Sequence, residues 1–198
     1  CYKDFNPFGA PTAGDPDGAQ PVLTDAGVAT PVNITVVYRK TPTRDKSFAA
    51  LKETWDKAGF NVTLEGITDK YYRTISGAAM KTKDAFYASW GADWPSGSTD
   101  IPPLFDGRIN ITPTSSNQDY GYYNSDAANK AMDAAYLITD PAAREKAWGD
   151  IDEMISKDGG VIPLVNQKFT FVYGSGVKNF EVNTLFGGYA DLANIAVK

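Results

Sequence analysis

Three side chains that could bind a small cation stand close together near the middle of the chain. Trp90, Asp93 and Trp94 follow one another so closely that one carboxylate falls between two indoles. A carboxylate supplies negative charge, and aromatic faces add cation–π attraction and stacking area, so the group suits a small cation. A structural interpretation is also open, in which two tryptophans fill a core beside an aspartate that caps its own turn.

The residues before this group predict the element that presents it. Apolar and small side chains alternate over residues 84–90, which is typical of a strand, and Gly91, Pro95 and Gly97 mark its end. Ligands in α/β sheets commonly bind at the carboxyl ends of strands. The turn therefore has the position expected of a binding site.

The first half of the chain predicts alternating helices and strands. Asp15 and Pro16 are suited to begin a helix that runs to Gly27. Gly59 is suited to end a second helix, and Trp55 lies on the apolar stripe of that helix, which is expected to face the core. The predicted strands cover residues 32–38 and 61–66, and the predicted helices that follow each strand cover 44–58 and 68–80. Two strands joined by one helix imply a parallel, right-handed crossover.

The second half predicts a long loop, two helices and a strand-rich end. Residues 91–124 are dense in Gly, Pro, Ser and Asn, and they allow at most a short helical turn around residues 101–105. Ser125 and Asp140 are suited to cap helices over 126–138 and 141–157. Strands are expected over 161–165 and 169–173, and the remainder is expected to form short strands and turns.

Composition excludes several classes of chemistry. The chain has 198 residues, no histidine and one cysteine, so histidine-based triads, histidine metal ligands and internal disulfides are excluded. A net charge of -5 with scattered Lys and Arg argues against a nucleic-acid surface. The sequence shows no run as long as a membrane span, no signal sequence at its start and no cofactor motif.

Four stretches, in order, resemble one known family. Residues 90–95 are similar to the Trp-x-x-Asp-x-Pro turn of the family 5 extracellular solute-binding proteins, the dipeptide and oligopeptide receptors of ABC importers. Residues 2–9, with the helix that begins near Asp15, resemble the start of that family's C-terminal lobe. Residues 32–66 resemble the β-α-β unit that follows, and residues 159–164 resemble its closing apolar-Pro-apolar strand.

The resemblance implies a fold and a domain arrangement. The expected class is α/β, a type II periplasmic-binding-protein-like C-terminal lobe with a mixed sheet flanked by helices. Residues 1–14 would be an extended segment leading into the lobe, and residues 15–169 would form the lobe itself. Residues 170–198 would be a tail that normally returns to the N-terminal lobe, which this chain does not contain, and that exposes an apolar patch here. The patch consists of Phe171, Val172, Phe180, Leu185, Phe186, Tyr189 and Leu192.

The resemblance also implies a function. The chain would be the C-terminal part of a non-catalytic receptor that binds oligopeptides for an ABC permease, outside the cell or in the periplasm, anchored through an N-terminal lipid signal that is missing here. Asp93 matches the acidic position that binds the peptide α-ammonium group. Trp90 and Trp94 would wall the pocket, Gly91 and Ala92 would admit the peptide backbone, and Tyr122 is a further candidate. Cys1 does not fit the lipidated position, because the residues after it resemble mid-chain family sequence.

Two other ligand or reaction classes remain open at this stage. An oligosaccharide could stack on the two indoles, with Asp93 accepting hydroxyl donors. A carboxylate pair such as Asp93 and Asp100 could perform glycosidic acid–base chemistry, although the sequence marks neither a nucleophile nor a raised carboxylate pKa. Tyr120 and Tyr123 are weaker ligand candidates, which equally suit a role in ordering the loop. Arg108 could pair with a ligand carboxylate, but a solvated loop charge is the preferred interpretation.

Overall fold

The structure is a computed structural model that describes residues 6, 8–9, 11, 14–165, 168–183 and 188–197. The chain forms two compact units, Cys1–Ser89 with Gly107–Asn124 and Trp90–Asp106 with Ser125–Lys198. Each unit is described by itself. Cys1, most of residues 1–14, and Leu185 and Phe186 of the predicted apolar patch lie outside the described residues.

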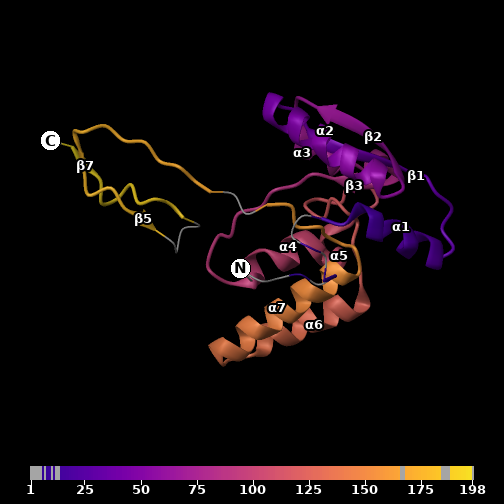
Figure 1. Ribbon diagram of the computed structural model, residues 1–198. Coiled ribbons are helices and arrows are strands. Elements are labelled where there is room, and N and C mark those ends of the chain that lie inside the picture. Colours follow the sequence, from indigo (N-terminus) through magenta and orange to yellow (C-terminus); the bar gives the residue numbers. More distant parts are fainter. Residues whose placement is uncertain are drawn as a thin grey trace. The chain divides into compact units, whose positions relative to one another are not determined.

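The first unit contains a parallel sheet with helices packed against it (Figure 1). The strand order is β2-β1-β3, and β1 pairs in parallel with both neighbours. Its elements in chain order are α1 (Pro16–Asp25), β1 (Val32–Arg39), α2 (Pro42–Lys57), β2 (Phe60–Ile67), α3 (Tyr71–Ile75), the 3-10 helix η1 (Ala78–Thr82), β3 (Ala85–Phe86) and α5 (Gly107–Asn110). The predicted helix, strand, helix and strand up to residue 66 and their parallel crossover are confirmed.

Alternation along β1 divides the core of this unit between two faces. Val36 and Tyr38 pack with Phe48 of α2, whereas Val37, which points to the opposite side, packs with Tyr71 and Ile75 of α3. This is the side-chain period of a strand that is covered on both faces. Trp55 of α2, predicted to lie in the core, is partly buried and packs against the same cluster as Phe48.

Two predictions for this unit were too long. The helix expected over 68–80 is only α3, because Gly77 adopts an extended conformation and forms an antiparallel bridge with Ser115. The strand expected over 84–90 is only β3. The Tyr87 N–H continues the pairing by donating to the Val37 carbonyl (2.8 Å), but the Tyr87 carbonyl accepts from the Tyr71 hydroxyl (2.6 Å), so a side chain supplies the next bond.

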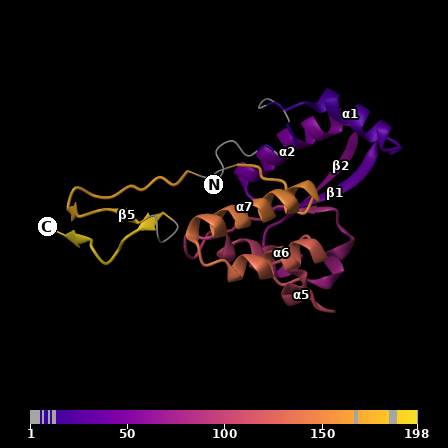
Figure 2. The ribbon, with the colours of Figure 1, turned by 90° about the horizontal axis from the view of Figure 1, so that it is seen from below.

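The second unit is built on a helical hairpin (Figures 1 and 2). Helices α6 (Asp126–Leu137) and α7 (Pro141–Lys157) lie side by side, and the predicted caps are confirmed: Ser125 Oγ accepts from the Ala128 N–H, and Asp140 Oδ1 accepts from the Ala143 N–H. The 3-10 helix η2 (Gly97–Thr99) and α4 (Ile101–Phe105) precede them. The long loop expected over 91–124 therefore contains three short helices, α5 among them, rather than one turn.

The C-terminal part of this unit forms two small antiparallel pairs. β4 (Val177–Lys178) pairs with β7 (Ala196–Val197), and β5 (Val182–Asn183) pairs with β6 (Tyr189–Ala190). The prediction of short strands in this part of the chain is confirmed. The strands expected over 161–165 and 169–173 are not found in the described part of the chain. Apolar composition favours a strand only where a neighbouring strand completes the hydrogen-bond ladder.

Candidate functional site

The turn at residues 90–100 is closed by hydrogen bonds between its own residues. The Ser96 N–H donates to the Trp94 carbonyl (2.8 Å), and the Thr99 N–H donates to the Ser96 carbonyl (3.1 Å). Ser96 also caps η2, since its side chain accepts from the Ser98 N–H. Short polar residues that bond to nearby backbone groups favour such compact turns over regular helix or strand.

Asp93 lies at the surface of this turn. Its backbone N–H donates to Thr99 Oγ1 (3.0 Å), and its Oδ2 accepts from the same hydroxyl (3.3 Å). The side chain is exposed although one oxygen has a partner within the turn. An exposed carboxylate held by a neighbouring hydroxyl can accept a further donor from a ligand.

The two tryptophans combine satisfied N–H groups with exposed rings. The Trp90 indole N–H donates to the Thr99 carbonyl (3.0 Å), and the Trp94 indole N–H donates to Ser98 Oγ (3.1 Å). Trp90 is 37% exposed and Trp94 is 52% exposed. The interpretation in which this pair fills a core is therefore wrong, because rings of that exposure retain apolar surface that a ligand could cover.

Gly91 has open space where a side chain would stand. A Cβ built on Gly91 would meet no atom within 4 Å, and Ala92 is half-buried. An open glycine between a tryptophan and an aspartate allows another polypeptide backbone to approach closely.

Gly97 anchors the turn to α7. A Cβ built on Gly97 would lie 2.6 Å from the Trp148 Cβ, so only glycine fits against this side chain. Trp148 is buried and packs edge-to-face on Tyr136 of α6, with 5.2 Å between ring centroids. The turn thus rests on the buried side of the helical hairpin.

The sequence did not identify Thr99 or the contact between Gly97 and Trp148. Gly97 stood out only as a turn residue, and Trp148 was not among the candidates. The run of small hydroxyl residues from Ser96 to Thr99 was the available signal, since such residues close turns through their side chains. Nothing local indicates that Thr99 is buried.

A second carboxylate near the turn has a perturbed pKa. Burial raises the pKa of Asp100 above its usual range, and the nearby negative charges of Asp93 and Asp152 raise it further. Burial also raises the pKa of Asp152. The sequence showed no sign of the raised pKa of Asp100, because its cause is a partly buried position that no local pattern reveals.

Tyr122 belongs to the first unit, and the structure gives it local partners there. Its hydroxyl donates to the Gly77 carbonyl (3.4 Å), and Lys81 Nζ lies 5.6 Å from its ring centroid. Its backbone has a positive φ of 54°. These contacts order the loop around it, whereas the turn at residues 90–100 belongs to the second unit.

The other candidates from the same loop also have structural surroundings. Tyr120 packs on Tyr72 with 5.6 Å between ring centroids, and burial raises its pKa. Tyr123 is half-buried and Arg108 is exposed. The ring pair of Tyr120 and Tyr72 is typical of packing between a loop and a helix.

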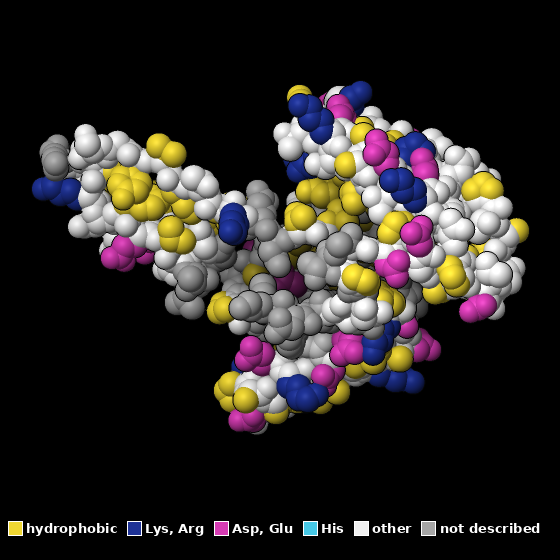
Figure 3. All heavy atoms as spheres, in the orientation of Figure 1, with side chains coloured by type: hydrophobic (Ala, Val, Ile, Leu, Met, Phe, Trp, Pro, Cys, Tyr) yellow, Lys and Arg dark blue, Asp and Glu magenta, His cyan; other side chains and the backbone are white. Residues whose placement is uncertain are grey.

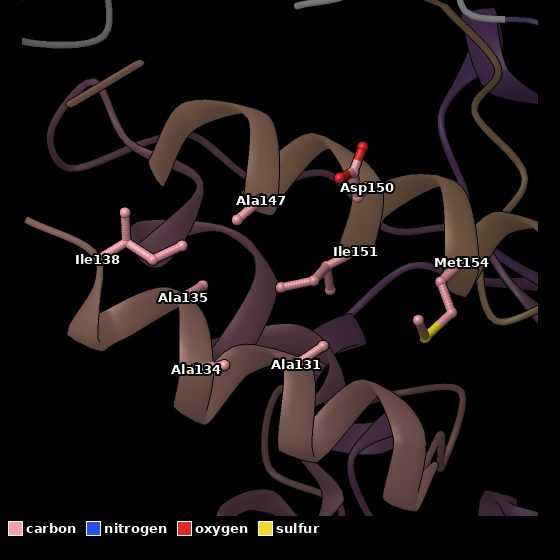
Figure 4. A pocket seen from close by; sticks show the side chains of 8 residues that line it. All are labelled: Ala131, Ala134, Ala135, Ile138, Ala147, Asp150, Ile151 and Met154. Atoms are coloured by element: carbon pink, nitrogen blue, oxygen red, sulfur yellow. The ribbon is translucent and has the colours of Figure 1, made fainter. Parts of the chain in front are cut away.

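An apolar groove lies between α6 and α7 (Figure 4). It has a volume of about 220 Å³, and alanines of α6 face Ile151 and Met154 of α7 across it. Asp150, at its edge, forms an exposed ion pair with Lys146 (2.6 Å). None of the predicted site residues lines this groove.

Metal binding and membrane insertion find no support in the described residues. Within them, no group of three or more Cys, Asp or Glu side chains is placed to hold a metal ion. No helix in the same part of the chain combines the length and apolar character that a membrane span needs.

Comparison with known proteins defines the class and then the family. The fold is that of a type II periplasmic binding protein: a solved structure titled "Clavulanic acid biosynthesis oligopeptide binding protein 2" superimposes with a TM-score of 0.81 at 23% identity, covering 93% of this chain and 34% of that one. A family model described as "Bacterial extracellular solute-binding proteins, family 5 Middle" matches residues 2–112. The chain belongs to this family of solute-binding proteins.

Two further matches are to named peptide-binding proteins. The periplasmic oligopeptide-binding protein OppA of Haemophilus influenzae is 27% identical over 161 residues, which is 79% of this chain and 28% of that protein. A crystal structure of the Haemophilus influenzae protein in complex with the peptide RPPGFSPFR superimposes with a TM-score of 0.65 at 23% identity, covering 92% of this chain and 34% of that one. The chain thus spans about a third or less of the length of these relatives.

Proposed function

We propose that this chain is the C-terminal lobe of an oligopeptide receptor and that the turn at residues 90–94 binds the amino-terminal end of the peptide. The observation that carries the proposal is the exposed Asp93 carboxylate, which falls between Trp90 and Trp94 in the sequence. The rings of these tryptophans are partly exposed, and their N–H groups already have partners. An α-ammonium group would pair with the carboxylate, and the indole faces would cover the adjoining apolar atoms.

Gly91 and Ala92 complete this site in the proposal. The open space at Gly91 would admit the peptide backbone, whose groups can bond to backbone groups of the receptor. Tyr122 is kept as a further ligand candidate on the family resemblance alone. The names of two matched proteins, which describe oligopeptide binding, support this choice of ligand class.

The same proposal assigns partners to the chain. An N-terminal lobe would supply the other half of the site, and an ABC permease would accept the ligand from the closed receptor. The receptor would act in the periplasm or outside the cell, held by an N-terminal lipid anchor, and it would catalyse no reaction. The low share of each relative that the chain covers supports a role as one lobe.

The apolar tail supports a packing role for residues 170–198. Hydrophobic side chains gather over the segment that carries β4 and β7 (Figure 3). Val172 is 94% exposed, and Leu192 and Tyr189 are also exposed. Apolar surface of this kind is typical of a face that another protein part covers, and the N-terminal lobe of the same receptor is the proposed cover.

Peptide titration of the full-length receptor tests the ligand assignment. We expect Asp93→Asn to weaken binding of tri-alanine by about 10- to 100-fold, because a charged hydrogen bond is lost. N-acetylated tri-alanine, which has no ammonium group, should bind weakly to both proteins. The exposed Asp69→Asn serves as the control substitution and should change neither affinity.

Titration of the same receptor with cellotriose, followed by calorimetry, tests the oligosaccharide alternative. Two results together would overturn the peptide assignment. The receptor would bind the sugar and lose that binding in Trp90→Ala or Trp94→Ala, and its binding of tri-alanine would be unaffected by Asp93→Asn. Hydrolysis of the sugar that depends on Asp93 and Asp100 would overturn the non-catalytic assignment.

A further inference from the structure

We infer that Thr99 is the positioning residue of this site: its hydroxyl holds Asp93, and its carbonyl holds Trp90, in the arrangement that receives the peptide's α-ammonium group. The inference rests on the proposed function and adds to it a residue that lies outside the Trp-x-x-Asp-x-Pro turn. Thr99 itself is not proposed to touch the peptide, because it is 1% exposed.

The burial of Thr99 contrasts with the exposure of the residues that it contacts. Asp93 and Trp90 lie at the surface, whereas the threonine side chain beneath them is covered. A buried hydroxyl must have hydrogen-bond partners, or its removal from water is costly. Both partners of this hydroxyl are on Asp93, namely the backbone N–H (3.0 Å) and the carboxylate Oδ2 (3.3 Å).

These two bonds restrict the aspartate in two ways. The bond to the N–H fixes the backbone of Asp93, and the bond to Oδ2 limits the rotation of its side chain. A charged acceptor such as a carboxylate gains more from a hydroxyl donor than a neutral acceptor does. The hydroxyl therefore favours one orientation of the ionised acid before any ligand arrives.

The third bond connects the same residue to an indole. The Thr99 carbonyl accepts from the Trp90 N–H (3.0 Å), so one buried residue holds both the acid and the ring that lies three residues before it. Trp94 is held differently, through Ser98 Oγ, which in turn donates to Ser96 Oγ (3.0 Å). The acid and the first indole thus share one support, and the second indole has its own.

Thr99 is in turn fixed to the helical hairpin. It ends η2, whose first residue, Gly97, packs directly against the buried Trp148 of α7. A side chain oriented by a rigid neighbour loses less entropy when a ligand binds. Removing the Thr99 hydroxyl should therefore weaken binding through the orientation of Asp93, without removing any atom that touches the peptide.

A comparison of free and N-acetylated tri-alanine tests this role in the full-length receptor. Thr99→Val keeps the size of the side chain and the carbonyl but lacks the hydroxyl. We expect it to weaken binding of free tri-alanine by about tenfold and that of the acetylated peptide by less than about twofold. Thr99→Ser, which restores a hydroxyl, should return the affinity for the free peptide to near that of the unaltered receptor.

Ser98→Ala is the matched comparison within the same turn. It removes the acceptor of Trp94 but leaves both bonds to Asp93, so it should affect the free and acetylated peptides by the same factor. An amide NMR spectrum without ligand gives a second measurement: the Asp93 N–H resonance should shift in Thr99→Val and stay in Ser98→Ala. Thr99→Ala, which also lacks the hydroxyl, replaces Thr99→Val if the latter does not fold.

The outcomes separate the inference from the proposed function. If Asp93→Asn weakens free tri-alanine while Thr99→Val leaves it unchanged, or weakens both peptides equally, the positioning role is overturned and the binding role of the turn stands. If Asp93→Asn itself has no effect on free tri-alanine, the peptide site is overturned, and the role of Thr99 in it is overturned too.

Discussion

Aromatic residues serve different purposes in the layer between β1 and α2 and in the turn at residues 90–100. In the layer, Phe48 is 3% exposed and stacks on Tyr38 with 4.7 Å between ring centroids, while Tyr87 meets it edge-on at 5.7 Å. In the turn, Trp90 and Trp94 have hydrogen-bonded N–H groups, but their rings remain partly exposed. The rings of the layer are packed against one another, whereas part of each ring in the turn is exposed to solvent.

The difference shows how the chain keeps apolar area at its surface. A partly exposed ring gains less from burial than a covered ring does, so hydrogen bonds contribute more to its orientation. The turn supplies these bonds from Ser98 and Thr99, whereas the layer orients its rings by mutual packing. Substitutions in the layer should therefore change stability, and substitutions in the turn should change ligand affinity.

The largest expected effect is that of Phe48→Ala. We expect the free energy of unfolding to fall by about 3–5 kcal/mol, because the substitution leaves a cavity between β1 and α2. Urea denaturation of the variant and of the unaltered protein measures this difference in the free energy of unfolding. Trp94→Ala is the comparison, and its cost should be below about 1 kcal/mol because the ring is half exposed. Equal costs for the two substitutions would contradict the distinction between the two regions.

A smaller effect separates two glycines of the turn. Gly97→Ala should destabilise the protein by about 1–3 kcal/mol, because its Cβ would overlap with Trp148. Gly91→Ala has open space and should leave the melting temperature unchanged, while weakening peptide binding if the peptide backbone approaches there. Thermal denaturation and tri-alanine titration of both variants provide the measurement. A loss of stability in Gly91→Ala would indicate that this residue has a packing role instead.

The smallest effect concerns the pH dependence contributed by Asp100. Its pKa is raised in the folded protein, so ionisation at neutral pH opposes folding and protonation favours it. We expect Asp100→Asn to stabilise the protein at pH 7 by less than about 1 kcal/mol, since the carboxyl is partly exposed and screened. The gain should vanish below the usual pKa of an aspartate, where both states of the unaltered protein bind the proton.

Melting temperatures at pH 3 and pH 7 test this prediction, with Asp69→Asn as the control. A gain that is the same at both pH values would show that the amide stabilises the protein by another route, such as a new hydrogen bond. A loss at pH 7 would mean that the ionised Asp100 contributes favourably to the fold.

Local signals predicted the elements that begin and end within their own residues. Ser125 and Asp140 cap their helices as expected, and Gly59, with a φ of 99°, follows the last turn of α2. Strong alternation over residues 32–38 predicted β1 and its two faces. The failures occurred where a distant residue intervenes, as when the Tyr71 hydroxyl donates to the Tyr87 carbonyl just beyond β3.

The sequence by itself determined the chemistry that is available: an acid between two indoles, no histidine and a single cysteine. It also determined the helix caps and the parallel β-α-β unit, because those depend on neighbouring residues and on periodicity. Only the tertiary structure decided that the two rings stay exposed, that Thr99 is buried beneath Asp93, and that Gly97 contacts Trp148. Burial and close contact depend on which distant segments meet, and no local pattern encodes that meeting.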